Sequence, residues 1–147
     1  MNKHLAKVIL IICLIVKSPD VSSDISLYAY NDVIIPNNIN NYMLTNIFTR
    51  KTLYWQNGQK IVVFVKKMTS FEHKAFVSQI LGISAFKYDT LLERSTYSGD
   101  AESVIELATD LEMIVNIAKT PYSIGYTNYG IIINLKDMGI KKVYEIN

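Results

Sequence analysis

The chain has 147 residues, enough for one compact domain with a sizeable core and too few for two comfortable ones. Its apolar fraction of 50% is above that of a typical soluble chain, and part of the excess lies in the first sixteen residues. The net charge is +2 with both signs scattered, and no basic run alternates with aromatic residues, which excludes an electrostatic basis for nucleic acid binding.

The N-terminus has the pattern of a secretory signal peptide. A short basic segment precedes nine apolar residues, 8–16, and such a stretch is too short to span a bilayer as a helix. Small residues end at Ser23, so we expect a signal peptide over 1–23 and a mature periplasmic domain over 24–147. An uncleaved membrane anchor is the alternative interpretation.

The residues that remain after cleavage argue against several kinds of chemistry. Cys13 is the only cysteine, so a chain that begins at Asp24 would hold neither a disulfide nor a cysteine nucleophile. His4 would also be removed, which leaves too few histidines for a His-based metal site. No carboxylate pair, nucleophile with a base, or metal cluster has suitable spacing in the sequence, and Asp110 and Glu112 are better explained as solvated helix charges. We therefore expect no enzyme, no catalytic residue, no metal and no cofactor.

The first part of the mature chain predicts a strand and a short helix. Residues 25–30 alternate modestly and run into a loop at Asn31, where a ligand contact is possible. Residues 42–50 carry apolar side chains at helical spacing. The loop 51–58 follows, and its last two residues, Asn57-Gly58, favour a tight turn.

The centre of the sequence predicts a buried strand followed by a helix. The run Ile61 to Val65 is apolar throughout, as in a strand covered on both faces in the middle of a sheet. Thr69 and Glu72 have the spacing of a capping box, which predicts that a helix begins there. Gly82 is expected to be its left-handed C-cap, and the residues expected to face the sheet are Phe71, Ala75, Phe76, Ile80 and Leu81.

This strand-to-helix junction is also a candidate anion site. Free backbone N–H groups are expected near Thr69 and Ser70, at the start of the helix, with Lys66 and Lys67 beside them. An ordinary capped helix is the simpler interpretation of the same pattern.

Beyond Gly82 the sequence predicts two more helices. Ser84 can cap the first, whose last turn carries Arg94, either a functional cation or a solvated C-terminal charge. Asp100 resembles the N-cap of a long helix with an apolar stripe over 104–118, which ends at Thr120-Pro121.

The C-terminal part predicts three further strands. Residues 124–127 form the first, with Gly125 where another part of the chain must come close. Residues 131–135 and 142–146 form the others, on either side of a turn at 137–139. Because strands and helices alternate, the sequence predicts a single α/β domain with a mixed sheet flanked by helices.

The order of these pieces is itself recognisable. They resemble the short phosphate-binding-protein-like members of the type II periplasmic binding protein family, relatives of the substrate-binding component of phosphate ABC transporters. The segments that carry the resemblance are Leu44 to Phe48, Trp55 to Ile61, Ser70 to Phe76, Leu81-Gly82, Arg94 to Gly99 and Ile124 to Tyr126. The resemblance implies a reduced type II periplasmic binding fold that holds an oxyanion with loop hydroxyls and helix N-termini.

The resemblance also implies particular site residues. The family's serine at the helix start corresponds to Ser70, its Gly-Tyr pair to Gly125 and Tyr126, and its aromatic-Ser-Gly turn to 97–99. Three positions depart from the family pattern: an arginine is replaced by His73, a tryptophan by Leu92 and a glycine by Ala101.

Two functions follow from these observations. The first is a binding module for a small oxyanion, with phosphate the first candidate, linked to ABC-type uptake or sensing through a permease or another envelope protein. Membrane contact is expected only through such a partner. The expected ligand-binding residues are Asn31, Thr69, Ser70, Phe71, Arg94, Ser98, Gly99, Gly125 and Tyr126. The alternative is an envelope interaction protein that keeps the receptor fold without a ligand.

Overall fold

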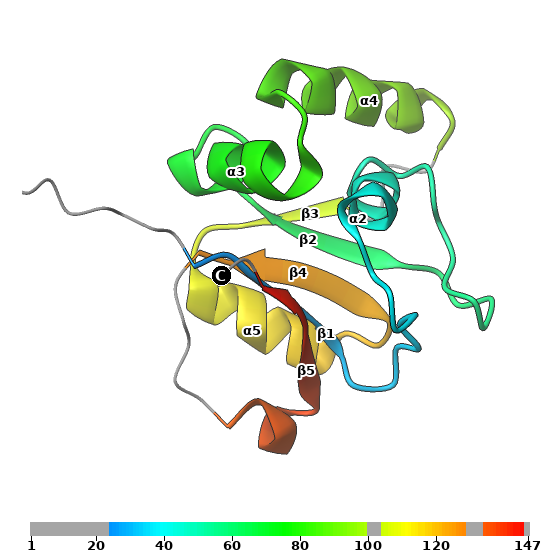
Figure 1. Cartoon of the computed structure of the whole chain (residues 1–147), viewed down its shortest axis with the longest axis vertical. Helices are drawn as coiled ribbons and strands as arrows, with labels where there is room; N and C mark the ends of the chain where they lie inside the picture. Colours follow the sequence, from blue (N-terminus) through cyan, green and yellow to red (C-terminus); the bar gives the residue numbers. More distant parts are fainter. Residues whose placement is uncertain (1–23, 100–103, 129–133, 146–147) are drawn as a thin grey trace, which may run out of the picture.

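A five-stranded mixed sheet organises the molecule in a computed structural model that describes residues 24–99, 104–128 and 134–145 (Figure 1). The strand order is β3-β2-β4-β1-β5. β2 pairs in parallel with β3 and β4, while β1 pairs antiparallel with β4 and β5. The strands are β1 (Ser26–Tyr30), β2 (Val62–Lys66), β3 (Val104–Leu107), β4 (Ser123–Thr127) and β5 (Ile140–Glu145).

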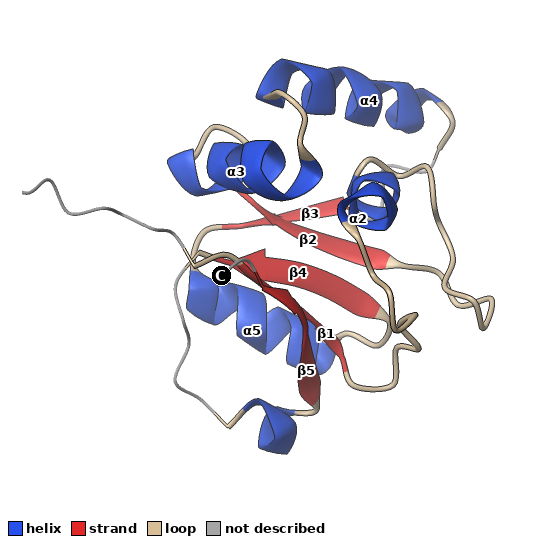
Figure 2. Ribbon diagram, viewed as in Figure 1, coloured by secondary structure: helices blue, strands red, loops and turns tan. Residues whose placement is uncertain are grey.

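Helices cover both faces of this sheet (Figure 2). On one face lie α2 (Asn41–Phe48), α3 (Phe71–Phe76) with its π-helical continuation η1 (Val77–Leu81), and α4 (Ala85–Tyr97). On the other lies α5 (Asp110–Lys119), and a short 3-10 helix, η3 (Leu135–Met138), precedes β5. The prediction of a single α/β domain with a mixed sheet between helices is confirmed.

Alternating side chains of the strands fill two cores. Val63 and Val65 of β2 belong to the core under α2, α3 and η1, whereas Phe64 packs with Met113 and Ile117 of α5. The run Ile61 to Val65 is therefore covered on both faces, as predicted, because β2 is an interior strand between two layers of helices.

The helix after β2 follows its predicted course with one exception. Ala75, Phe76, Ile80 and Leu81 are buried, and Gly82 ends the helix with a φ of 67°. Phe71 was expected to face the sheet and does not, since it lies at the first helical position and is 73% exposed.

α4 begins at its predicted cap. The Ser84 hydroxyl oxygen accepts a hydrogen bond from the Lys87 N–H at 3.1 Å. The helix continues to Tyr97, and Arg94 lies in its last turn as predicted.

The largest correction concerns the segment predicted as one long helix over 104–118. Val104–Leu107 is instead β3, an edge strand parallel to β2, and the helix begins only at Asp110. The apolar residues of this segment match a helical period, but the backbone of β3 is paired along β2 and Thr109 has extended dihedral angles, so the helix cannot start earlier. Asp100, its expected N-cap, lies outside the described residues.

The C-terminal predictions hold in part. β5 confirms a strand near 142–146, although Ile146 is not among the described residues. Of the strand predicted over 131–135, only Asn134 and Leu135 are described, and they form the N-cap and the first residue of η3 instead of ending a strand. The close approach at Gly125 is confirmed, because a Cβ there would collide with Met113 and would lie 3.2 Å from Phe64 Cβ.

Candidate functional site

The carboxyl ends of β2, β3 and β4 lie at one edge of the sheet because the three strands are parallel. We call this the carboxyl edge. The chain leaves β2 into α3 and β3 into α5, so two helices on opposite faces both begin there, at the left of the sheet in Figure 1. In open α/β sheets, this edge is where ligands usually bind.

Ser70 caps α3. Its hydroxyl oxygen accepts the His73 N–H at 3.1 Å, and its own N–H donates to the Lys67 carbonyl at 2.8 Å. The predicted capping box led by Thr69 is therefore wrong by one residue, because Ser70 is the extended residue that precedes the first helical turn. Thr69 and Phe71 flank this cap and are both exposed.

The capping box is found instead at the start of α5. The Thr109 hydroxyl oxygen accepts the Glu112 N–H at 3.1 Å, while a Glu112 carboxylate oxygen accepts the N–H groups of Ala108 at 2.8 Å and Thr109 at 3.3 Å. Glu112 is thus a capping residue and not merely a solvated charge.

Asp110, the first residue of α5, also has a definite role. Its carboxylate lies 2.5 Å from the ammonium of Lys66, whose side chain is only 6% exposed. The carboxylate itself is 21% exposed. The pair joins the end of β2 to the start of α5, and it partly neutralises the cation that was expected to face an anion.

A second polar group lies on the α3 face of the same edge. The Tyr126 hydroxyl oxygen accepts the Lys66 N–H at 3.0 Å and lies 2.8 Å from His73 Nδ1. Since the backbone amide supplies one hydrogen to Tyr126, its own hydroxyl hydrogen is best donated to a neutral histidine. Burial lowers the pKa of His73, although Asp89 and Glu106 oppose that shift.

Tyr126 is held in place by its ring as well as its hydroxyl. The ring stacks on Phe76 with centroids 3.7 Å apart, and burial raises the pKa of the phenol well above its usual value. The hydrogen-bonded Tyr126 therefore remains neutral and positions β2 against β4.

Asn128 follows β4 at the carboxyl edge and is 2% exposed. Its amide nitrogen donates to the Glu72 carbonyl of α3 at 3.2 Å, which fixes the orientation of the side chain. The amide oxygen Oδ1 is buried without a hydrogen-bond partner. One unused acceptor thus lies at this edge of the sheet, since Asp110 Oδ1 is taken up by the ion pair with Lys66.

The nine residues predicted to bind ligand do not form one cluster. Thr69, Ser70 and Phe71 lie at the carboxyl edge, and Gly125 and Tyr126 lie in the core behind it. Ser98 and Gly99 end α4 just before β3 begins, at the opposite edge of the sheet, on the right in Figure 1. Asn31 also lies at the opposite edge, because β1 runs antiparallel to β4.

Arg94 is separated from Ser70 as well. It lies exposed in the last turn of α4, whereas Ser70 starts α3 at the other end of this helical layer (Figure 1). Whether any of these residues binds a ligand stays a prediction, but the structure does not bring Arg94 to Ser70.

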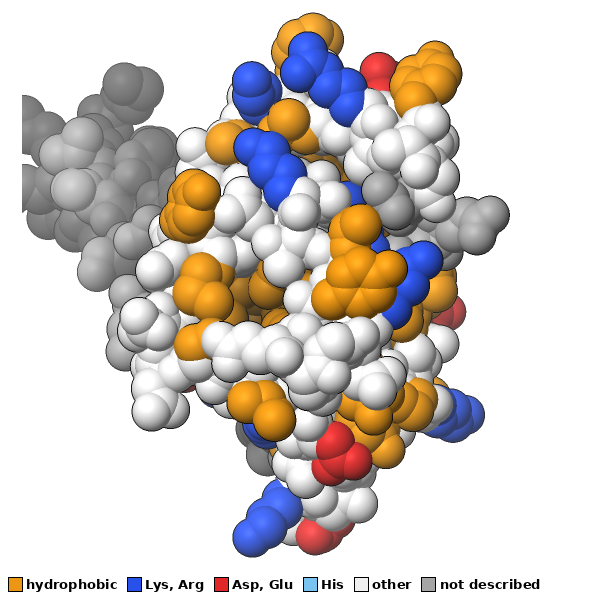
Figure 3. Space-filling view, turned by 90° about the vertical axis from the view of Figure 1, so that its right-hand side faces the viewer, with side chains coloured by type: hydrophobic (Ala, Val, Ile, Leu, Met, Phe, Trp, Pro, Cys, Tyr) orange, Lys and Arg blue, Asp and Glu red, His pale blue; other side chains and the backbone are white. Residues whose placement is uncertain are grey.

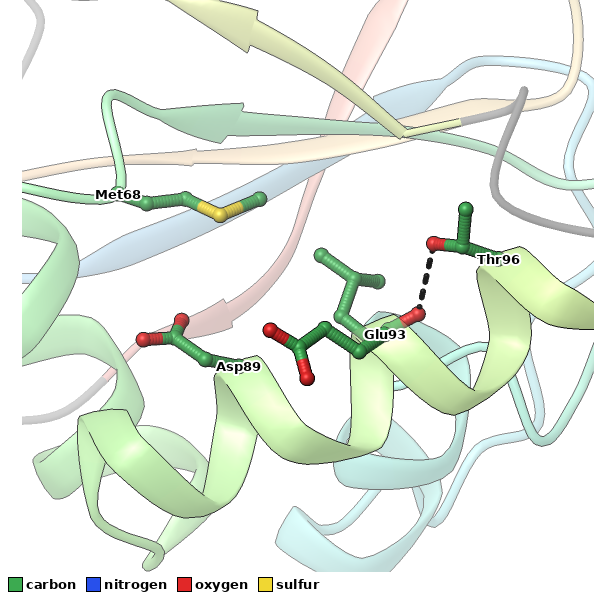
Figure 4. Close-up of a pocket in the computed structure, with 5 residues that line it drawn as sticks. Met68, Asp89, Glu93 and Thr96 are labelled. Carbon is green, nitrogen blue, oxygen red and sulfur yellow. Dashed lines mark hydrogen bonds between the residues drawn. The ribbon is translucent and has the colours of Figure 1, made fainter.

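A pocket of about 250 Å³ lies between Met68 and α4 (Figure 4). Asp89 and Glu93 extend into it from the helix, and Leu92 and Thr96 complete its lining. Two carboxylates make this pocket unfavourable for an oxyanion. It is therefore distinct in chemistry from the start of α3, although Met68 comes only two residues before Ser70.

Neither a metal site nor a membrane span is found within the part of the chain that the structure describes. Its histidine, aspartate and glutamate side chains form no group of three that could hold a metal ion. None of its helices has both the length and the apolar composition needed to cross a bilayer.

Sequence reasoning missed Thr109, Asp110 and Asn128 as residues of this edge. Thr109 and Glu112 carry a readable signal, since Thr-x-x-Glu ahead of an apolar run marks a helix start. Asn128 had no comparable signal, because its position depends on where β4 ends beside β2.

Comparison with known proteins supports the fold alone. No protein-family model matches the sequence, and no curated protein gives a significant match. The chain is similar in structure to PstS from Borrelia burgdorferi, with a TM-score of 0.59 and 19% identity over 82% of this chain and 46% of that one. An ABC-type phosphate transport receptor from Vibrio cholerae gives a TM-score of 0.58 and 15% identity over 82% of this chain and 45% of that one. The chain thus spans about half the length of these receptors.

Proposed function

We propose that this chain is an oxyanion-binding module of the periplasmic receptor type and that its ligand is phosphate, bound at the carboxyl edge. The observation that carries the proposal is the convergence of two capped helix starts, those of α3 and α5, at one edge of the sheet. The fold agrees with it, because a phosphate transport receptor is among the similar structures. A secreted, periplasmic location and work alongside an ABC permease belong to the same proposal.

The first turn of α3 offers several donors to an anion. Ser70 uses its hydroxyl oxygen as an acceptor for the cap, which leaves its hydroxyl hydrogen available to donate. Helix geometry leaves the N–H groups of Phe71 and Glu72 without intrahelical partners. Lys67, exposed just before the turn, adds a full positive charge.

The surrounding carboxylates favour a ligand that carries a proton. Asp110 already pairs with Lys66, and Glu106 accepts the Met68 N–H at 3.1 Å, so a fully ionised anion would meet negative charge here. Asn128 holds a buried acceptor oxygen, Oδ1, with no hydrogen-bond partner. A hydrogen phosphate can donate a proton to such an acceptor, and sulfate at neutral pH cannot.

Calorimetric titration with phosphate, sulfate and molybdate tests the proposal. We expect saturable binding of phosphate and weaker binding of sulfate. Ser70→Ala should weaken phosphate binding by about 1 to 2 kcal/mol, the contribution of one hydrogen bond to a charged group. It should also cost about 1 kcal/mol of stability, because Ser70 is the N-cap.

Ser84→Ala is the matched control for this variant. Ser84 caps a different helix, α4, with the same geometry and should cost similar stability, but its hydroxyl is not among the donors proposed for the anion, so binding should be unchanged. Equal binding by the wild type and Ser70→Ala would refute the role of the Ser70 hydroxyl.

A second candidate is an envelope interaction protein that keeps the fold without a ligand. It is favoured by the separation of Arg94 from Ser70 and by His73, a buried neutral side chain where the family has an arginine. A folded wild-type protein that binds none of the three anions would support this function instead.

A further inference from the structure

We propose that the opposite edge of the sheet docks on an anionic lipid bilayer. This surface, which we call the amino edge, surrounds the starts of the parallel strands β2, β3 and β4. The exposed residues that define it here are Lys51, Tyr54, Lys60, Arg94, Tyr97 and Lys119. The inference is independent of the proposed oxyanion function, which uses the carboxyl edge.

Charge is unevenly distributed along the chain. Residues 33–71 contain five lysines and arginines and no aspartate or glutamate, although the whole chain has 15 basic and 13 acidic residues. This segment thus has a net charge of +5, and the rest of the chain, with 10 basic and 13 acidic residues, has −3. Of these five cations, Lys51 and Lys60 belong to the amino edge. Arg50 and Lys66 are buried, and Lys67 lies near the carboxyl edge.

Part of this segment forms a hairpin that projects from the amino edge, at the right of Figure 1. Tyr54 and Lys60 pair across it, and the Trp55 N–H donates to the Gln59 carbonyl at 2.9 Å. The Trp55 indole is buried and donates to the Tyr122 carbonyl at 2.8 Å, just before β4. The hairpin is therefore held firmly while its Tyr54 side chain remains 56% exposed.

The end of α4 repeats this pairing of an aromatic ring with a cation. Arg94 and Tyr97 are three residues apart in the last turns of the helix, so they share a face, and Tyr97 is 94% exposed. Lys119 ends α5 just before β4 and adds a fourth cation. In Figure 3, which views this side, most basic side chains lie in the upper half, with hydrophobic groups among them, while acidic side chains are few and scattered from top to bottom.

A lipid surface fits these features better than a protein partner does. Specific protein interfaces have a contiguous apolar centre that excludes water. The exposed aromatic residues here are single rings on a projecting hairpin and a helix end, each beside a cation. Tyrosine favours the boundary between headgroups and hydrocarbon, and lysine and arginine are attracted to anionic headgroups.

Co-sedimentation of the full chain with lipid vesicles tests the proposal. We expect binding to vesicles of equal parts phosphatidylcholine and phosphatidylglycerol, much weaker binding to phosphatidylcholine alone, and a decrease with added salt. Lys51→Glu combined with Lys60→Glu should weaken binding at least about twenty-five-fold, since each lysine contributes about fivefold. Tyr54→Ala should weaken binding without altering its dependence on salt.

The matched control reverses two exposed lysines near the other edge. Lys67→Glu combined with Lys74→Glu makes the same change in net charge and should leave vesicle binding within about twofold of the wild type. Equal loss in both double variants would overturn the proposal, because overall charge would then explain binding. Binding to neutral vesicles as strong as binding to anionic vesicles would also overturn it. So would a lack of binding to anionic vesicles, even if an acidic protein bound the same edge.

Discussion

The ion pair between Lys66 and Asp110 makes the start of α5 sensitive to a single change. Asp110→Asn removes the negative charge and leaves a buried ammonium, because the Lys66 side chain is only 6% exposed. Breaking a fully buried pair costs about 3 to 5 kcal/mol, and an exposed pair contributes about 0 to 1 kcal/mol. Since Asp110 is 21% exposed and water can reach the site from its side, we expect a loss of about 2 to 3 kcal/mol.

A double-mutant cycle measured by urea unfolding separates the pair from other effects. Lys66→Met alone should cost less, about 1 kcal/mol, because the remaining carboxylate is partly solvated. The double variant should recover much of the loss, with a coupling energy of about 1 to 2 kcal/mol.

The exposed pair of Lys142 and Glu145 provides the control. Its side chains are 41% and 39% exposed, so Glu145→Gln should leave the unfolding midpoint nearly unchanged. A loss for Asp110→Asn no greater than for Glu145→Gln would refute the reasoning. It would also favour the sequence interpretation in which Asp110 is a solvated residue within one long helix.

Three further predictions concern the core, the pH dependence and the N-terminus. Gly125→Ala should destabilise the protein by about 1 to 3 kcal/mol in urea unfolding, because the added methyl group collides with Met113, and a neutral effect would show that α5 can move aside. The pKa of His73 is lowered in the folded state, so the unfolded chain takes up a proton on this residue first as the pH falls. The free energy of unfolding should therefore be unaffected by His73 above about pH 6.5. Below that pH it should decrease by at most about 1.4 kcal/mol per pH unit. His73→Gln should remove that slope between about pH 5 and 6.5, and an identical slope in this variant would assign it to other groups. Mass spectrometry of a periplasmic extract should find a chain that begins near Asp24, and an intact Met1 in the membrane fraction would contradict the signal peptide.

Local signals in the sequence predicted most of the fold. The apolar run Ile61 to Val65 identified the buried strand, while Gly82 and Ser84 marked a helix end and the next helix start. These predictions succeed because the physical cause lies within a few residues of the feature. A left-handed glycine or a hydroxyl cap acts on its own turn of helix.

Features that depend on distant contacts were not predicted. Val104–Leu107 has too few residues to reveal a strand by itself, and its pairing partner β2 is about forty residues away. The shift of the cap from Thr69 to Ser70 has a similar origin, since the turn that orients Ser70 is closed by its bond to the Lys67 carbonyl.

The error at β3 also changes the interpretation of the site. A continuous helix over 104–118 would have left Asp110 in its middle, with no reason to approach Lys66. Once Val104–Leu107 is a strand parallel to β2, the following helix must begin where β2 ends, because parallel strands share their carboxyl edge. The assignment of four residues therefore decides whether the candidate site has one helix start or two, and whether its lysine is free or paired.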